Sequence, residues 1–208
     1  MGSLKIPGYQ VFEKTRNTKG GGGLLTAVDE DLEPVLISTG TEEAETLTVE
    51  TKVGDKRVRI INGYGPQEDD DKQTILNFWQ EIEKEVVAAK DDGCMVIIEM
   101  DANAKVGNQV IKMDPHEQSN NGKILVEFAL RQDLAIVNSH NRCKGAITRE
   151  RAFENKVEKS IIDYVLVCQE LLQYLIQMTI DQERIFVLTN HLKKKNPLNR
   201  LKLQAITI

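Results

Sequence analysis

The residues best suited to chemistry are an aspartate and an asparagine that follow a short apolar run. Residues 94–100 are apolar apart from Glu99 and contain no Gly or Pro, which predicts a strand buried on both faces. Asp101 and Asn103 follow two residues apart, so an extended backbone places them on the same side. Mg²⁺ takes one or two carboxylates together with waters and a phosphate, which this pair suits. The alternative is a simple turn, since Asp and Asn commonly follow strands.

Two further segments carry residues of the same kind. N-G-Y-G-P at residues 62–66 closes a β-rich segment and places Tyr64 near the end of that strand. K-S-I-I-D-Y-V-L-V at residues 159–167 predicts a strand with Asp163 in its middle. Because a charged Asp within an apolar strand costs free energy to bury unless it is paired, Asp163 is a candidate functional residue.

These segments resemble motifs of the endonuclease/exonuclease/phosphatase superfamily, the Mg²⁺-dependent phosphodiesterases that include apurinic endonucleases and deoxyribonuclease I. M-D-A-N-A at residues 100–104 is similar to the G-D-F-N-A motif of the family, with Met100 in place of Gly and Ala102 in place of Phe. Residues 62–66 look like its Tyr-x-Pro element, and residues 159–167 look like its late strand with an Asp-Tyr pair.

Other segments resemble one branch of that family. A-K-V-G at residues 104–107 and N-G-K-I-L-V-E-F at residues 121–128 are most similar to the endonuclease domains of non-LTR retrotransposons and their domesticated relatives. The early segments G-Y-Q-V-F and G-G-G-G-L-L fit the same group. The resemblance covers nearly the whole chain, and the order of the blocks makes it more specific than any single motif.

The resemblance implies a fold and a set of roles. The fold is α/β, a two-layered β-sandwich flanked by helices, as in deoxyribonuclease I. Asp101 and Asn103 would bind a metal, Mg²⁺ or Mn²⁺, and the phosphate. Tyr64 would donate a hydrogen bond to the phosphate, and Asp163 would orient a catalytic His. His191 is the candidate for that His.

Some parts of the family's site have no evident counterpart. The family uses an Asn and a metal-binding Glu upstream of the segment that resembles residues 5–12, and only residues 1–4 precede that segment here. T-N-H at residues 189–191 is either a degenerate copy of the closing Ser-Asp-His or an unrelated segment, in which case His191 is a surface residue. We therefore expect a fold truncated at the N-terminus, and in the second case at the C-terminus too. Loss of one group from a coupled site removes several orders of magnitude in rate. An incomplete sandwich should also expose a strand or a core face.

Three functions follow from these observations. The first is Mg²⁺-dependent cleavage of phosphodiester bonds in DNA, as in target nicking for a retrotransposon, weakened or lost here. A reverse-transcriptase domain in a longer parent polypeptide would fit that origin. The second is an inert domesticated relic that acts as a binding or structural domain. The third, a phosphatase of the same superfamily acting on a lipid or a nucleotide, ranks below both because the loops most resemble retrotransposon endonucleases.

Composition sets broad limits. At 208 residues and 40% hydrophobic, the chain is long enough for one sizeable core, so a single domain spanning residues 1–208 is expected. The formal charge of −5 gives no overall basic character. The three scattered cysteines indicate reduced thiols and an intracellular protein of nucleus or cytoplasm. No apolar run approaches the ~20 residues of a membrane span.

The remaining pattern predicts the elements that position these residues. β-rich segments recur at intervals of about ten residues, followed by an amphipathic helix that Gly93 ends. The acids at residues 69–71 suit the positive end of that helix better than a metal cluster. The predicted strands cover residues 9–12, 24–28, 35–38, 47–53, 58–63, 134–138, 178–180 and 185–188, and further helices cover 123–132 and 170–177.

A charged stretch at residues 139–159 contains six arginines and lysines. In the resembling family this region forms substrate-facing loops and a hairpin. Because Arg and Lys make most contacts to phosphates, this stretch is the candidate DNA-facing surface. A merely solvated face is an equally good interpretation.

Overall fold

A central sheet of six strands organises the molecule. The computed structural model describes residues 4–16, 23–41, 43–154, 156–180 and 201–204. The strand order is β3-β4-β5-β6-β11-β7, with β5 and β6 parallel and every other neighbouring pair antiparallel. The strands are β3 (Val35–Ser38), β4 (Glu45–Val53), β5 (Lys56–Tyr64), β6 (Met95–Asp101), β7 (Leu134–Ile136) and β11 (Asp163–Cys168).

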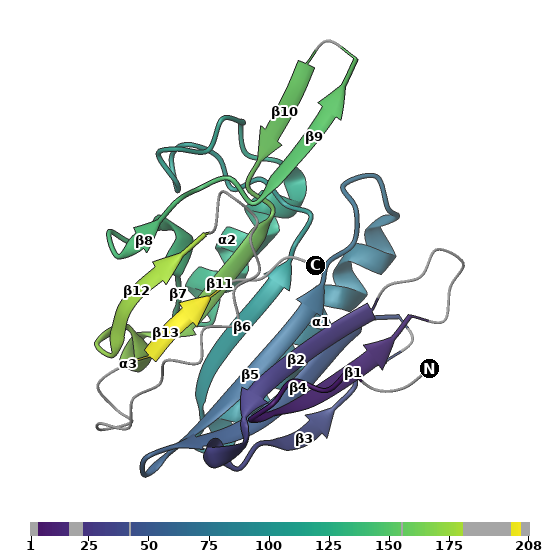
Figure 1. Ribbon diagram of the computed structural model, residues 1–208. Coiled ribbons are helices and arrows are strands. Elements are labelled where there is room, and N and C mark those ends of the chain that lie inside the picture. The colour runs from purple at the N-terminus through teal and green to yellow at the C-terminus, as the bar shows by residue number, and fades with distance from the viewer. Residues whose placement is uncertain (1–3, 17–22, 42, 155, 181–200, 205–208) are drawn as a thin grey trace.

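Two smaller groups of strands cover one face of this sheet, and two helices cover the other (Figure 1). One group is the hairpin of β1 (Tyr9–Thr15) and β2 (Gly23–Asp29). The other is β8 (Cys143–Lys144), β12 (Leu175–Thr179) and β13 (Leu201–Gln204). The helices behind the sheet are α1 (Lys72–Asp91) and α2 (Asn120–Arg131). The expected α/β sandwich with flanking helices is therefore confirmed.

The first helix has the cap and the apolar face that its sequence predicts. Asp71 is the N-cap, and its Oδ1 accepts hydrogen bonds from the backbone N–H groups of Gln73 and Thr74 at 2.9 and 3.0 Å. The acid run therefore begins a helix, as predicted. The buried residues of its apolar face are Ile75, Phe78, Trp79, Ile82, Val86 and Ala89.

The segment after β11 is the main departure from the predicted elements. Residues 170–177 were expected to be one helix, but only α3 (Gln169–Leu172) is helical, and Leu175 begins strand β12. The reason is tertiary: Met178 is fully buried and pairs in parallel with Cys143 of β8. Pairing with a distant strand overrides a weak local helix preference. The strand expected at residues 185–188 lies outside the described residues.

Two boundaries near the predicted site also differ. The strand expected at residues 134–138 ends at Ile136 and continues as the 3₁₀ turn η2 (Val137–Ser139). Within that turn, the Asn138 side chain donates to the Asp163 carbonyl at 3.0 Å and accepts from the Val165 N–H at 2.9 Å. Asp163 is the first residue of β11 and not a middle one. The sequence pattern could not show this, because Ile162 leaves the ladder to donate its N–H to the Thr148 hydroxyl at 2.9 Å.

The outer edges of the molecule include one exposed strand and one projecting hairpin. Strand β3 lies at the edge of the central sheet, and its Val35, Leu36 and Ile37 are 57, 46 and 44% exposed. The hairpin of β9 (Arg149–Phe153) and β10 (Lys156–Ser160) projects away from the sheet (Figure 1). In the described part of the chain, no helix is long and apolar enough to cross a membrane.

Candidate active site

Four side chains stand in a row at one end of the central sheet. Strand register pairs Glu45 with Tyr64, Tyr64 with Asp101, and Asp101 with Asp163. Register partners on neighbouring strands share a face of the sheet. All four side chains therefore project from the same face, the one that β1 and β2 cover. The structure thus brings together Tyr64, Asp101 and Asp163, which the sequence singled out separately.

Parallel pairing of β5 and β6 explains why two of these residues meet. Because the strands run in the same direction and in register, their carboxyl ends coincide at Tyr64 and Asp101. The chain beyond them is fastened by a hydrogen bond from the Gly65 N–H to the Asp101 carbonyl at 2.7 Å. A Cβ at residue 65 would lie 2.8 Å from the Ala102 carbonyl oxygen, so the close approach requires glycine.

Asn103 occupies a left-handed turn directly after Asp101. Its φ is 45°, a conformation that Asn tolerates better than most residues. Its backbone N–H donates to Asp101 Oδ1 at 3.0 Å, and its side-chain Nδ2 donates to the Gly65 carbonyl at 2.8 Å. The turn that the sequence offered as an alternative is therefore present. It orients the amide so that its nitrogen faces Gly65, which leaves Oδ1 as the atom that could contact a ligand.

Asp101 and Asp163 form an electrostatically strained pair. Burial and, second to it, the neighbouring Asp163 carboxylate raise the pKa of Asp101 to about 6, against the Asn103 N–H and the charges of Arg149 and Arg16. Asp163 is itself only 8% exposed. Its position is fixed through its backbone, whose N–H donates to Thr148 Oγ1 at 3.2 Å. A cation placed between two such carboxylates would relieve their repulsion.

The side-chain oxygens of this site suit a metal ion that also binds a substrate. Among the described residues, no group of three or more His, Cys, Asp or Glu side chains is arranged to hold a metal ion. The predicted metal ligands are the Asp101 carboxylate and the Asn103 amide oxygen, and the Asp163 carboxylate is the register neighbour of Asp101. Mg²⁺ commonly keeps several waters and uses one or two carboxylates with a substrate phosphate. The site therefore suits such an ion and does not form a closed protein cage.

Tyr64 and Tyr164 have different roles in the architecture. Tyr64 is partly buried, and its hydroxyl accepts a hydrogen bond from Gln67 Nε2 at 3.2 Å. Tyr164 faces away from the row and is 1% exposed. Its hydroxyl lies 3.0 Å from the Ala104 carbonyl and 3.3 Å from the Val106 nitrogen. It therefore holds the loop that follows Asn103.

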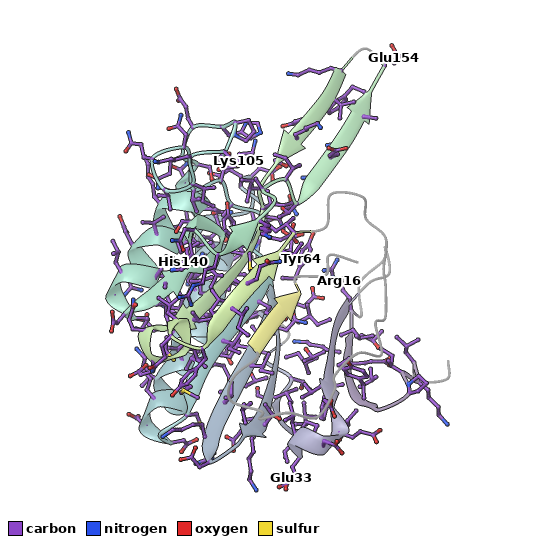
Figure 2. All side chains as sticks on the ribbon, turned by 60° about the vertical axis from the view of Figure 1, so that its left-hand side comes forward. Arg16, Glu33, Tyr64, Lys105, His140 and Glu154 are labelled. Atoms are coloured by element: carbon purple, nitrogen blue, oxygen red, sulfur yellow. The ribbon has the colours of Figure 1, made fainter. Side chains whose placement is uncertain are left out.

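Sequence reasoning missed two residues at this site, Glu45 and Arg16. Arg16 follows β1, and its Cζ lies 4.3 Å from the centroid of the Tyr64 ring (Figure 2). It is paired with Glu45. Glu45 could have been found, because the tight turn at Gly54 pairs Val53 with Lys56 and so fixes Glu45 opposite Tyr64. Arg16 follows β1, in the hairpin that packs on the central sheet, and no sequence pattern indicates that Arg16 lies near Tyr64.

The histidines do not complete the row within the described residues. His191 lies outside those residues, so its role stays a prediction. His116 Nε2 lies 3.0 Å from the Lys159 carbonyl, and His140 Nδ1 accepts from the Arg142 N–H at 3.2 Å. Both bonds fasten loops.

Comparison with known proteins identifies the fold. No family model and no curated protein sequence matches the chain. Among solved structures, it is similar to the endonuclease domain of TRAS1, a telomere-specific non-LTR retrotransposon. The TM-score is 0.61 at 20% identity, over 81% of this chain and 71% of that domain. It is also similar to the 3′-5′ exonuclease NExo from Neisseria meningitidis, with a TM-score of 0.60 at 15% identity over 91% of this chain and 77% of that one.

A third similar structure is a phosphatase. The mannosyl-6-phosphatase Bt3783 of Bacteroides thetaiotaomicron has a TM-score of 0.50 at 14% identity, and the match spans 79% of this chain and 64% of that one. At such identities the likeness shows the fold alone. That fold is the deoxyribonuclease-I-like α/β sandwich shared by endonucleases, exonucleases and phosphatases, as the sequence motifs predicted.

Proposed function

We propose that this chain, which has the fold of the endonuclease/exonuclease/phosphatase superfamily, is a metal-dependent phosphodiester hydrolase that nicks DNA, in the manner of a retrotransposon endonuclease and at a low rate. One observation carries the proposal: Tyr64, Asp101 and Asp163 come from three separate motifs and stand in one register row on one face of the sheet. Two of the similar solved structures, the TRAS1 endonuclease domain and the exonuclease NExo, are nucleases.

The residues of the row have distinct roles in this proposal. Asp101 and the Asn103 amide oxygen hold a divalent cation, Mg²⁺ or Mn²⁺, which when bound polarises the phosphoryl oxygen. Tyr64 donates its hydroxyl hydrogen to a non-bridging oxygen of the phosphate. Asp163 orients the histidine that acts on the attacking water, for which His191 is the candidate.

The projecting hairpin supports DNA as the substrate. Its residues 149–159 carry four cations and three acids, and Arg149 lies at its base. Two of the acids, Glu150 and Glu158, form ion pairs with Lys159 and Lys105 at 2.9 and 3.7 Å. Arg149 lies close enough to Asp101 for its charge to oppose the rise in the Asp101 pKa. A duplex that lies along the hairpin would therefore reach the carboxylate row. This role fits an intracellular chain whose parent polypeptide carries reverse transcriptase.

Two other functions are favoured by specific observations. The described row contains three buried or partly buried acids, with the Asn103 amide beside them, but no histidine, which fits an inert binding domain. The similarity to a mannosyl-6-phosphatase fits hydrolysis of a small phosphate ester. Both alternatives predict that supercoiled DNA is left intact.

Plasmid nicking separates these functions. We expect the full chain to nick supercoiled DNA in Mg²⁺ but not in EDTA, and Asp101→Ala to reduce the rate at least about a hundredfold. Asp69→Ala is the matched control, because Asp69 is an exposed acid of the run before α1. Nicking that does not exceed that of Asp101→Ala would identify an inert domain. Hydrolysis of a sugar phosphate or phosphoinositide without nicking would identify a phosphatase.

A further inference from the structure

Arg16, which follows strand β1, lies beside the row formed by Glu45, Tyr64, Asp101 and Asp163. Arg16 follows the last residue of β1, and its guanidinium lies over the Tyr64 ring and reaches Glu45 (Figure 2). Its side chain is 28% exposed, so it borders solvent as well as the row. Arg16 is thus the cation beside the residue that we propose contacts the phosphate.

The fold fixes the approach of Arg16. Lys14, two residues earlier on β1, donates from Nζ to the carbonyls of Thr41 and Ala44 at 2.9 and 3.1 Å. Those carbonyls belong to the turn that leads into Glu45 and the start of β4. The end of β1 is therefore fastened to the turn that precedes the row, which holds Arg16 beside Glu45 and Tyr64.

The ion pair between Arg16 and Glu45 uses only one of the two carboxylate oxygens. Arg16 Nε and Nη2 both contact the same oxygen, Glu45 Oε2, at 2.8 and 2.7 Å. Glu45 Oε1 is buried and makes no hydrogen bond to any described residue. The pair of Arg57 with Glu50 uses both oxygens instead, at 2.8 and 3.0 Å, the two-point geometry that strengthens such pairs. The Arg16–Glu45 pair therefore lacks the two-oxygen match of the Arg57–Glu50 pair.

On the basis of the proposed function, we infer that Arg16 is a phosphate-binding residue that stays ion-paired with Glu45 until DNA binds. When DNA binds, the guanidinium exchanges the Glu45 carboxylate for the phosphate next to the one at Tyr64. The planar fork of Arg matches two oxygens of a phosphate, which a single carboxylate oxygen does not. No covalent bond changes in this exchange.

Charge explains why such a cation is needed. The row holds three acids, Glu45, Asp101 and Asp163, within a chain of net charge −5, so it repels a polyanion. Arg16 already acts on the row, because its charge opposes the rise in the Asp101 pKa. Release from Glu45 would make that charge available to the DNA backbone.

The test is the salt dependence of DNA binding by the full chain, measured in EDTA as the anisotropy of a short labelled duplex. Each phosphate contact contributes about 0.9 to the slope of log K against log salt concentration. We expect Arg16→Gln to lower that slope by about 0.9. Arg16→Lys keeps the charge and should keep most of the slope. Lys52→Gln is the control, because Lys52 pairs with Glu33 at the opposite end of β4 and should leave the slope unchanged.

The role of Glu45 requires a second set of variants. Glu45→Gln should raise affinity about fivefold, because the neutral amide holds the Arg16 guanidinium less strongly in this partly exposed pair. Glu43→Gln removes an acid two residues away that bonds Asn77 and not Arg16, so it reports the general effect of charge. In an Arg16→Gln background, the gain from Glu45→Gln should fall to that of Glu43→Gln, since the two residues act as a pair.

The outcomes are distinguishable. An unchanged slope in folded Arg16→Gln, with wild-type binding intact, overturns this inference and leaves the proposed nuclease standing. Equal gains in DNA affinity from Glu45→Gln and Glu43→Gln overturn the inference that Glu45 pairs with Arg16 until DNA binds. Absence of salt-dependent binding by the wild-type chain overturns both this inference and DNA as the substrate.

Discussion

At the scale of single residues, the backbone of Asn103 places two demands on one position. Its left-handed φ of 45° favours Asn or Gly over other residues, and its amide links Asp101 to the Gly65 carbonyl. A conformational role and a ligand role therefore coincide. They are separable, because glycine satisfies the first demand without supplying an amide.

Asn103→Gly and Asn103→Ala make that separation measurable. Both variants lose the amide, so we expect both to reduce Mg²⁺-dependent nicking at least about a hundredfold. Only the Ala variant strains the turn, so its free energy of unfolding should be about 1 kcal/mol lower than that of the Gly variant. Urea denaturation and plasmid nicking report the two effects. Full activity in the Gly variant would show that Asn103 only shapes the turn.

The residues of the row differ in how far the sequence revealed them. Asp101 and Tyr64 end apolar strands, and such polar residues at strand ends are visible in a linear pattern. Asp163 was found because a carboxylate among apolar neighbours is costly, although its place at the start of β11 was not. Arg16 approaches from another layer, so only the packing of β1 on the central sheet reveals it. The pattern of polar and apolar residues in the sequence therefore indicates strand ends, but it does not indicate which residues meet where the β1–β2 hairpin packs on the central sheet.

At the scale of elements, helix α2 packs very closely against the loop that carries Asn103. Gly122 lies in the first turn of α2, and a Cβ there would lie 1.9 Å from the Lys105 carbonyl oxygen. The same carbonyl accepts the Ser119 N–H at 2.9 Å. The helix start therefore supports the loop, and any added atom must displace it.

Gly122→Ala is expected to damage both stability and activity. The added methyl group overlaps backbone atoms, so the free energy of unfolding should fall by about 3 kcal/mol. Nicking should fall as well, since Lys105 is two residues from Asn103. Gly93→Ala is the control: it has a φ of 72° and open space around its Cα, so it should cost about 1 kcal/mol and spare nicking. Equal effects of the two variants would contradict this packing argument.

An ionic cluster fastens the opposite end of the sheet to α1. Arg59 is 3% exposed and bonds Glu50 on β4 and Asp92 after α1. Hydrogen bonds from Arg57, together with Arg59 and Cys94 and against the effect of burial, lower the pKa of Glu50 to about 2. A carboxylate whose pKa falls on folding stabilises the native state above its unfolded pKa, and that stabilisation is lost as pH falls through the folded pKa.

Glu50→Gln should therefore remove a pH-dependent part of the stability. At neutral pH it leaves Arg59 buried with only one carboxylate partner, which should cost about 3 kcal/mol. The difference from wild type should shrink as pH falls from 4.5 towards 2, where Glu50 becomes protonated. Urea unfolding at a series of pH values measures it, with Glu154→Gln at the exposed hairpin as control. A difference that does not change over this range would contradict the assignment to Glu50.

At the scale of the whole molecule, the two ends of the central sheet serve different purposes. One end is locked by the Arg59 cluster, whose acids are neutralised by arginines. The other end gathers Glu45, Asp101 and Asp163 with Arg16 as the cation paired within the row. The same sheet thus keeps its paired charges at the structural end and its strained charges at the candidate site. The projecting hairpin lies at the strained end (Figure 1), where Thr148, the residue before β9, accepts a hydrogen bond from the Asp163 N–H.

Shortening that hairpin tests whether the molecule as a whole is built for DNA. Glu150 and Lys159 are register partners, so replacing residues 151–158 with Asn-Gly gives a tight two-residue turn between them. The removed residues carry two cations and two acids, so net charge stays the same. We expect DNA affinity to fall about tenfold through lost contact surface, about 1.4 kcal/mol. Hydrolysis of a small nitrophenyl phosphodiester should be unchanged, because Arg149 and the row remain. If both substrates lose activity equally, the hairpin supports the fold of the site and not the recognition of DNA.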